Sequence, residues 1–327
     1  MLTTLLAVLA LIVGFVLLIK GADFFIDGAT LIAKKFSIPE VIIGLTIVAF
    51  GTSAPEAAVS ISAGLQGSND IALGNCIGSN IFNLLIVAGF SMLFRPMKIT
   101  KTIIKTDYPF SIIAAILLVL LSLDSFAGFS GNYSAGVLSR FDGLILLIVF
   151  AMYMYSLIST TLQNKKLLQE EKSEKIPSGK IFALKIILGF VGLAGIIFGG
   201  DIVVKSASYI ARILGLSETI IGLTIVAMGT SLPELVTSII AAKKNQNDIA
   251  IGNVVGSNIF NIFFVLGASA TIHPITVGIF SIYDSIICIG VSLLFFIPMV
   301  KNKQVGRICG SLMILTYAAY TAYIFIR

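Results

Sequence analysis

Long apolar runs follow one another along almost the whole chain and limit what it can fold into. Each run has about 20 residues or more, the length a helix needs to cross the hydrocarbon core of a membrane. In lipid only helices and closed barrels satisfy their own backbone hydrogen bonds. Charged residues make up 12% of the 327 residues, against roughly 25% in soluble domains. The chain is therefore predicted to be an all-α polytopic membrane protein.

Applying this length along the sequence predicts ten transmembrane helices. The first and sixth are longer than a spanning helix needs to be, so we expect them to be tilted. Each carries charges part-way along, and the spacings Lys20–Asp23 and Asp201–Lys205 predict ion pairs on one helix face. The ten approximate ranges are 3–33, 39–64, 71–94, 108–124, 139–161, 181–210, 217–242, 249–271, 279–299 and 306–325.

Lysines and arginines divide unequally between the two sides of the predicted membrane. Loops on one side hold 18 of the 22 basic residues, and loops on the other side hold four. Because basic loops stay in the cytoplasm, segment 162–180 is predicted to be cytoplasmic and both termini to lie outside. The net charge of +6 then belongs to loops beside the lipid bilayer, and it predicts no nucleic-acid partner.

An internal repeat relates the two halves of the chain. Residues 44–83 and 222–261 are identical at 26 of 40 positions, at a constant offset of 178. Five predicted spans fall in each half, and an odd number means that the second half enters the membrane from the opposite side. The sequence therefore predicts two inverted five-helix repeats, 1–161 and 181–327, joined by the linker 162–180. In transporters of this architecture the substrate site lies at the repeat interface near the midplane.

The repeated motif places a proline and an acid inside an apolar span. In GTSAPE, residues 51–56, Pro55 has no N–H and its ring clashes with the carbonyl four residues earlier, so backbone carbonyls are freed. At membrane depth this is tolerated where the backbone lines a cavity. Glu56 and its counterpart Glu234 are intramembrane acids, which mark functional sites by default. No basic residue lies in spans two, three, seven or eight to neutralise them.

Further oxygen donors share helix faces with these acids. Ala49, Thr52 and Glu56 fall on one face, and Ser79 and Asn83 fall on another with the four-residue period of a helix. We interpret Asn75, Asn80, Asn253 and Asn258 as packing or capping groups. A pseudo-twofold axis between the halves would bring the two donor sets together. The second half supplies the matching residues Ala227, Thr230, Ser231, Glu234, Ser257 and Asn261.

This donor set favours a hard cation. Calcium takes 6 to 8 oxygen ligands in flexible geometry, whereas zinc and copper prefer histidine and cysteine, which form no cluster here. Two glutamates suit one divalent ion or two or more monovalent ions. With the site empty, the two carboxylates would repel in a low dielectric, so we hypothesise that protons compete with the cations. A single histidine excludes the HExxH zinc-protease motif, and no cofactor or enzymatic activity is predicted.

The doubled motif resembles a known family. GTSAPE and GTSLPE, each followed by GNxxGSNIFN, resemble the two alpha repeats of the cation/calcium antiporter superfamily and are most similar to its prokaryotic sodium/calcium exchanger branch. The resemblance implies ten helices, in which helices 2, 3, 7 and 8 form the ion core while helices 1 and 6 slide across it. It also implies antiport of calcium against sodium by alternating access, in the cytoplasmic membrane of a prokaryote.

The resemblance also implies roles for individual residues. Glu56 and Glu234 match the central calcium ligands, and Asn83 with Asn261 completes the middle of the site. The remaining positions match further ligands to calcium or sodium: Thr52, Thr230, Ser53 and Ser231 through hydroxyls, Ala49 and Ala227 through backbone carbonyls, and Ser79 and Ser257 at flanking sodium positions.

One departure from the family pattern concerns the middle of the site. Some relatives have an aspartate where this chain has Asn83 or Asn261, and potassium-dependent relatives favour acids there. Two asparagines therefore argue against potassium dependence and leave the sodium stoichiometry open. The GTS-x-PE form of the motif favours sodium as the ion exchanged for calcium. A calcium/proton antiporter is the alternative, and a cation channel is a further one. Coupling of calcium movement to a counter-gradient would discriminate an exchanger from a channel.

Overall fold

The computed structural model describes residues 2–67, 69–123, 134–169, 179–215, 227–302 and 304–326 of the chain. Helices make up most of it, in the order α1 Leu2–Phe36, α2 Glu40–Ile43, η1 Gly44–Val48, α3 Ala49–Thr52, α4 Ala54–Leu65, α5 Asn69–Phe82, η2 Asn83–Val87, α6 Ala88–Phe94, η3 Ile103–Asp107, α7 Tyr108–Ser122, α8 Arg140–Gln169, α9 Gly179–Ile213, α11 Ala227–Gly229, α12 Leu232–Lys243, α13 Asn247–Ile259, η5 Phe260–Leu266, α14 Gly267–Ile272, α15 Ile279–Asn302 and α16 Arg307–Ile326, where η marks a π-helical segment.

Membrane-crossing helices account for nearly all of these elements. Within the described ranges, eight helices are long and apolar enough to cross a membrane, and a ninth span results if the bent pair Glu40–Thr52 and Ala54–Leu65 crosses as one. The prediction of a helical membrane protein is thus confirmed, and four short strands among the described residues are the exception to an all-α fold. The predicted seventh span, 217–242, begins outside the described residues, and α12 lies in its described part. The count of ten therefore stays a prediction.

The two helical stretches that carry the repeated GNxxGSNIFN sequence form the centre of the molecule. Buried residues make up 94% of the most apolar window of Asn247–Ile272 and 78% of that of Ile71–Phe94. The corresponding share is 17% to 39% in the other six unbroken spans of the described residues. Close backbone contact holds α13 in place, because a Cβ added at Gly256 would come within 2.6 Å of the Leu45 carbonyl oxygen. These two stretches are therefore screened from lipid by the surrounding helices.

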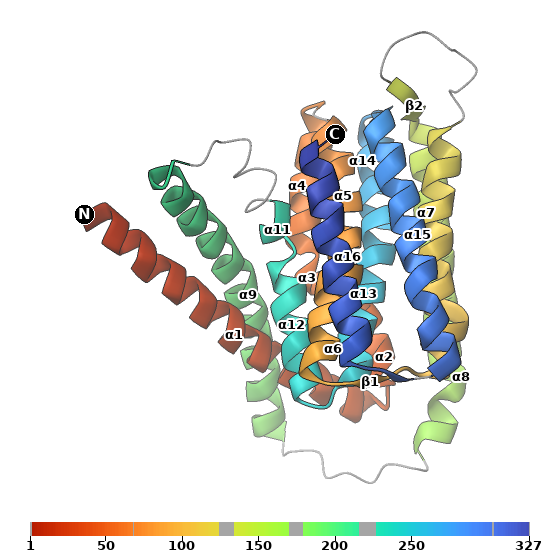
Figure 1. Ribbon diagram of the computed structural model, residues 1–327. Helices are drawn as coiled ribbons and strands as arrows, with labels where there is room; N and C mark the ends of the chain where they lie inside the picture. Colours follow the sequence, from red (N-terminus) through yellow and green to blue (C-terminus); the bar gives the residue numbers. More distant parts are fainter. Residues whose placement is uncertain are drawn as a thin grey trace.

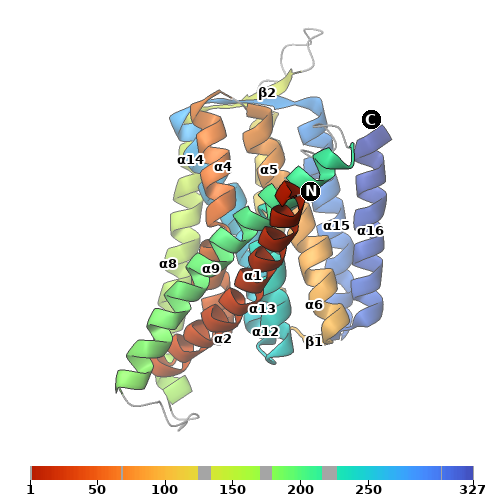
Figure 2. The ribbon, with the colours of Figure 1, turned by 90° about the vertical axis from the view of Figure 1, so that its left-hand side faces the viewer.

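Helices α1 and α9 form a separate pair that slopes across the others. Each has 35 residues, or roughly 52 Å of helix at 1.5 Å per residue, so the predicted long first and sixth helices are confirmed. They lie side by side at a slant in Figure 1, and Figure 2 shows them crossing in front of the bundle. Glycines line their contact: a Cβ added at Gly21 would lie 2.6 Å from the Gly192 carbonyl oxygen. Small residues of this kind let membrane helices approach closely.

Replacing Gly21 by alanine should force α1 and α9 apart. The added methyl would overlap the Gly192 carbonyl oxygen, and overpacking of this kind costs about 1–3 kcal/mol. We expect a lower midpoint of thermal unfolding for the purified protein in detergent. Gly290→Ala in α15 is the matched control, since its Cβ meets nothing within 4 Å and alanine favours a helix. Equal midpoints for the two variants would contradict this account of the helix pair.

Ion pairs on helices α1 and α9 follow the sequence prediction in one case and differ from it in the other. Lys205 Nζ lies 2.7 Å from Asp201 Oδ2, so that predicted pair is confirmed. The predicted Lys20–Asp23 pair is wrong. Asp23 binds Lys244, just after α12, at 2.7 Å, and Asp27 binds the same ammonium at 2.6 Å. The reason is tertiary: α1 packs against the end of α12, where a cation from another helix lies within reach of both aspartates.

Two short antiparallel strand pairs join distant segments at the ends of the bundle. β1 Met97–Lys98 pairs with β4 Gln304–Val305, and β2 Ser134–Leu138 pairs with β3 Ile275–Gly278. In Figure 1, β1 lies at the end where α8 finishes and α9 begins, and β2 lies at the opposite end. The strands therefore tie the first half of the chain to the second on both sides of the predicted membrane.

Candidate functional site

Two helix breaks place the repeated acids in the interior. The chain bends by 52° between Glu40–Thr52 and Ala54–Leu65, and Ser53 and Ser231 are the non-helical residues before α4 and α12. Pro55 and Pro233 follow in the first turn of the next helix, where a missing N–H removes no helical hydrogen bond. Each break is therefore built into the sequence, and it sets Glu56 or Glu234 in the first turn of the helix that follows.

Hydrogen bonds cross between the two halves at these breaks. The Ser53 hydroxyl donates to Oε1 of Glu234 at 2.7 Å, and the Ser231 hydroxyl lies 2.9 Å from Oε1 of Glu56. Ser231 Oγ also lies 3.0 Å from Oγ of Ser79. Both glutamates are 0% exposed. The serine of each motif thus contacts the acid of the other, so the two motifs form one buried cluster.

The central helices meet across the same region. The side-chain amide of Asn80 donates to the backbone carbonyl of Asn258 at 3.1 Å. The side-chain amide of Asn258 donates in turn to the backbone carbonyl of Asn80 at 3.2 Å. These positions differ by 178, the offset of the sequence repeat. Asn261 donates its amide to Oδ1 of Asn80 at 3.1 Å, which fixes the direction of the Asn261 side chain. Equivalent asparagines of the two repeated blocks therefore make the same hydrogen bond to each other in both directions.

Asn75 and Asn253 contact the site more closely than packing groups would. Oδ1 of Asn253 lies 3.0 Å from the Thr52 hydroxyl, and its amide lies 2.9 Å from Oγ of Ser238 and 3.4 Å from the Glu234 carbonyl. Asn75 repeats this pattern with the other half, and its Oδ1 lies 3.4 Å from the Thr230 hydroxyl. The sequence signal that could have identified them is their offset of 178 inside the repeated block.

The Asn253 contact controls what the Thr52 hydroxyl can do. That hydroxyl has one proton and three acceptors within reach: Oδ1 of Asn253 at 3.0 Å, the Val48 carbonyl at 3.1 Å and the Ala49 carbonyl at 3.3 Å. When the proton points to Asn253, both carbonyls keep lone pairs that could ligate a cation. The hydroxyl oxygen keeps its own lone pairs as well.

Several buried oxygens of the predicted ligands have no hydrogen-bond partner among the described residues. A buried polar atom without a partner costs free energy of about 1–3 kcal/mol, so a concentration of such atoms calls for an explanation. A bound cation would supply the missing partner. The oxygens are Oε2 of Glu56, Oε2 of Glu234, Oδ1 of Asn83, Oδ1 of Asn261 and Oγ of Ser257.

No side-chain cation balances the two acids within the described part of the chain. Ion pairs described there include those of Lys205 with Asp201 and of Lys244 with Asp23 and Asp27, and none involves Glu56 or Glu234. Two negative charges in a buried, low-dielectric site attract an external cation strongly. The donors are all hard oxygens, and the described residues hold no group of three or more histidine, cysteine or acidic side chains. The arrangement suits calcium or sodium better than zinc or copper.

The structure buries most of the predicted site residues, and hydrogen bonds join Ser53 to Glu234 and Ser231 to both Glu56 and Ser79. Thr230 is half-buried and touches Asn75, so it lies at the edge. Ala49 is buried at the start of α3, and Ala227 is the first residue described after 216–226, at the start of α11. The fully or almost fully buried members are Thr52, Ser53, Glu56, Ser79, Asn83, Ser231, Glu234, Ser257 and Asn261.

Comparison with known proteins gives concordant matches over almost the whole chain. Residues 6–159 and 184–326 match the family described as sodium/calcium exchanger protein. The sodium/calcium exchanger MaX1 of Methanosarcina acetivorans is 34% identical over 344 residues, covering 97% of this chain and 98% of that protein. The inner membrane protein YrbG of Escherichia coli is 36% identical over 277 residues, covering 83% and 81%.

A solved structure matches the fold as well. The sodium-calcium exchanger NCX_Mj, soaked with sodium and strontium, superposes with a TM-score of 0.81 at 30% identity, covering 98% of this chain and 99% of that one. These matches agree with the site, a buried cluster that takes one acid from each half of the chain. The chain belongs to the sodium/calcium exchanger protein family.

Proposed function

We propose that this protein is a secondary active antiporter that exchanges calcium for sodium across a membrane, and not an enzyme. The observation that carries the proposal is the buried pair Glu56 and Glu234, whose second carboxylate oxygens have no partner among the described residues. Names of relatives support the identity of the ions, since MaX1 and NCX_Mj are sodium/calcium exchangers.

The site would hold its cargo with oxygens from both halves. Calcium would bind between the two carboxylates, with hydroxyl and carbonyl oxygens completing the 6 to 8 ligands it takes. Sodium ions would compete for the same charge, so the two cargoes exclude each other. The proposed ligands are Glu56, Glu234, Thr52, Thr230, Ser53, Ser231, Ser79, Ser257, Asn83, Asn261 and the carbonyls of Ala49 and Ala227.

Alternating access would follow from the architecture that the repeat predicts. We propose ten helices in two inverted repeats, 1–161 and 181–327, with the linker 162–180 in the cytoplasm of a prokaryote and both termini outside. Supporting this, Asn75 and Asn253 make equivalent contacts at an offset of 178, and the paired helices α1 and α9 slope across the core. Their contact through small glycines would let them move together over the fixed site, opening it to one side at a time.

Calcium uptake into proteoliposomes tests the exchange. Vesicles loaded with sodium and diluted into sodium-free buffer should accumulate calcium above the external concentration, and a sodium ionophore should abolish the accumulation. Vesicles loaded with potassium or choline should not accumulate it. Accumulation driven by a proton gradient alone would support the calcium/proton alternative. Uptake that only equilibrates calcium, whatever the counter-gradient, would indicate a channel.

A further inference from the structure

A cavity lies between α15 and α16, and neither glutamate of the acidic cluster lines it. It has a volume of about 810 Å³, within the range of about 300–1,000 Å³ found for ligand pockets. Leu294 and Phe295 line it from α15, and Ile308 and Leu312 line it from α16. Leu294, Ile308 and Leu312 are among the exposed large apolar side chains. In the membrane this cavity would therefore face the acyl chains of lipid.

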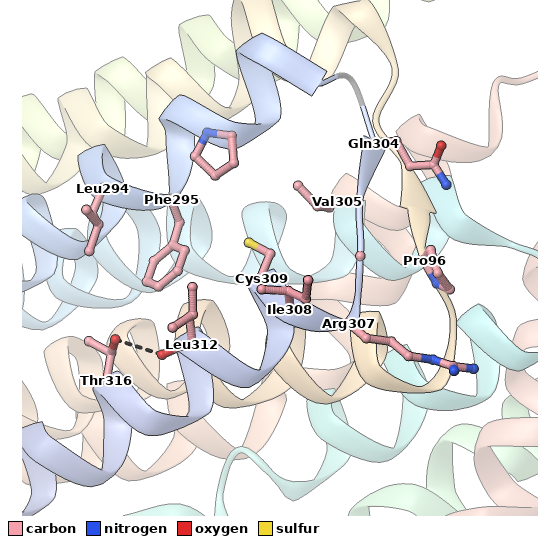
Figure 3. Close-up of a pocket in the computed structure, with 12 residues that line it drawn as sticks. Pro96, Leu294, Phe295, Gln304, Val305, Arg307, Ile308, Cys309, Leu312 and Thr316 are labelled. Atoms are coloured by element: carbon pink, nitrogen blue, oxygen red, sulfur yellow. Dashed lines mark hydrogen bonds between the residues drawn. The ribbon is translucent and has the colours of Figure 1, made fainter.

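The cavity has a polar end and an apolar end. Figure 3 shows Gln304 and Arg307 at one end, beside Pro96, and Leu294, Phe295 and Leu312 towards the other. Arg307 is the one charged residue in the lining that the structure describes. Its Nε donates to the Leu93 carbonyl at 3.2 Å. The side chain is exposed and extends past Pro96, on the side away from Leu294 and Phe295 (Figure 3). This layout matches a molecule with one anionic head and an apolar tail.

Positive charge extends beyond Arg307 at this mouth. Lys98 pairs through the backbone with Gln304 in the β1–β4 ladder, and Lys98 and Gln304 are both exposed. Lys301 is exposed at the end of α15. This is the end of the molecule at which α8 finishes and α9 begins (Figure 1), which the distribution of basic residues places in the cytoplasm. Anionic lipids give that leaflet a negative surface potential, which attracts basic groups.

We propose that the cavity binds one anionic phospholipid of the cytoplasmic leaflet, with an acyl chain between α15 and α16 and the headgroup phosphate on Arg307. A guanidinium forms paired, charge-assisted hydrogen bonds with phosphate, so this residue distinguishes the site from an ordinary lipid-facing groove. The binding is separate from ion exchange. It requires that the chain lies in a membrane, and the choice of leaflet rests on the orientation that the basic residues predict.

Native mass spectrometry of the full chain in mild detergent tests the site. The protein is mixed with equal amounts of phosphatidylglycerol and phosphatidylcholine that carry the same acyl chains. Both lipids offer a phosphate to Arg307, but the quaternary ammonium of phosphatidylcholine cancels the negative charge and would lie beside the exposed Arg307, Lys98 and Lys301. We therefore expect one phosphatidylglycerol to be retained about tenfold or more over phosphatidylcholine, because each basic group near an anionic lipid is worth about 1 kcal/mol. Arg307→Gln should bring retention down to that of phosphatidylcholine. Arg95→Gln is the matched control, since Arg95 is exposed at the same end but does not line the cavity.

A second pair of variants tests the apolar part without touching the charge. Cys309 is a free thiol in the lining, so Cys309→Phe should fill the cavity and reduce retention, whereas Cys309→Ser should not. Size-exclusion profiles and thermal unfolding identify variants that fail to fold. Equal retention of the two lipids by the unmodified protein, or equal retention by the Arg307 and Arg95 variants, would overturn the proposal. A dimer that Cys309→Phe dissociates would also overturn it, because a second copy would then cover this face.

Discussion

Glu56→Gln is expected to reduce sodium-driven calcium uptake at least ~100-fold, because removing one partner from a buried charged site costs about 3–5 kcal/mol of binding. Glutamine keeps the shape of the side chain and an oxygen that can accept from Ser231, which lies 2.9 Å from Oε1 of Glu56. The fold should therefore survive. Glu234→Gln should behave in the same way, since it occupies the equivalent position and contacts Ser53 at 2.7 Å.

The same variant separates a binding role from a structural one. In the absence of ions, two buried carboxylates repel, so removing one charge should leave the thermal midpoint of the ion-free protein unchanged or raise it. Calcium should raise the midpoint of the unmodified protein by mass action and should not raise that of Glu56→Gln. Asp201→Asn is the control acid, because its pair with Lys205 is exposed. A variant that loses ion-free stability but keeps the calcium-induced shift would show that Glu56 is structural.

Asn253→Leu and Thr52→Val are expected to weaken calcium binding by similar amounts and to be strongly non-additive. If Asn253 acts by accepting the Thr52 proton, over 3.0 Å, its effect disappears once the hydroxyl is gone. We expect about tenfold weaker binding for each single variant, since one such interaction is worth about 1.4 kcal/mol. The double variant should bind about as weakly as the weaker single variant. Calorimetric titration of calcium into the purified protein would measure these affinities.

The other half of the molecule supplies the matched cycle. Asn75 and Thr230 occupy the equivalent positions, but their contact is longer, at 3.4 Å, and both residues are only half-buried. The coupling between Asn75→Leu and Thr230→Val should therefore be smaller. A merely structural role for Asn253 predicts additive losses, because the bonds of its amide to Ser238 and to the Glu234 carbonyl do not involve Thr52. Additivity in both cycles would thus reject the positioning role.

Local features of the chain were enough to predict the kind of fold. Apolar runs long enough for a bilayer predict helices wherever they occur, because lipid leaves the backbone no other partner. The break at GTSAPE also follows from local chemistry: Pro55 cannot continue the preceding helix, and the chain bends by 52° there. The composition of the candidate site stays a prediction, in which oxygen donors and two acids in a repeated block favour a hard cation.

Contacts between distant residues could not be predicted in this way. Asp23 was expected to bind Lys20, three residues away, but it binds Lys244 at 2.7 Å, since the partner depends on how α1 packs. Asn253 was interpreted as a packing or capping group, and only the tertiary structure shows that its Oδ1 lies 3.0 Å from the Thr52 hydroxyl. Helical spacing states which residues share a face, but not what that face meets.

By itself, the sequence determined that the chain crosses the membrane as helices, that its two halves carry the same motif, and that the motif supplies oxygens and two acids. Only the tertiary structure decided that the serine of each motif contacts the acid of the other, Ser53 with Glu234 and Ser231 with Glu56. The physical reason is one of range. Hydrophobicity and backbone chemistry act within a segment, whereas the packing of α4, α5, α12 and α13 selects which oxygens meet.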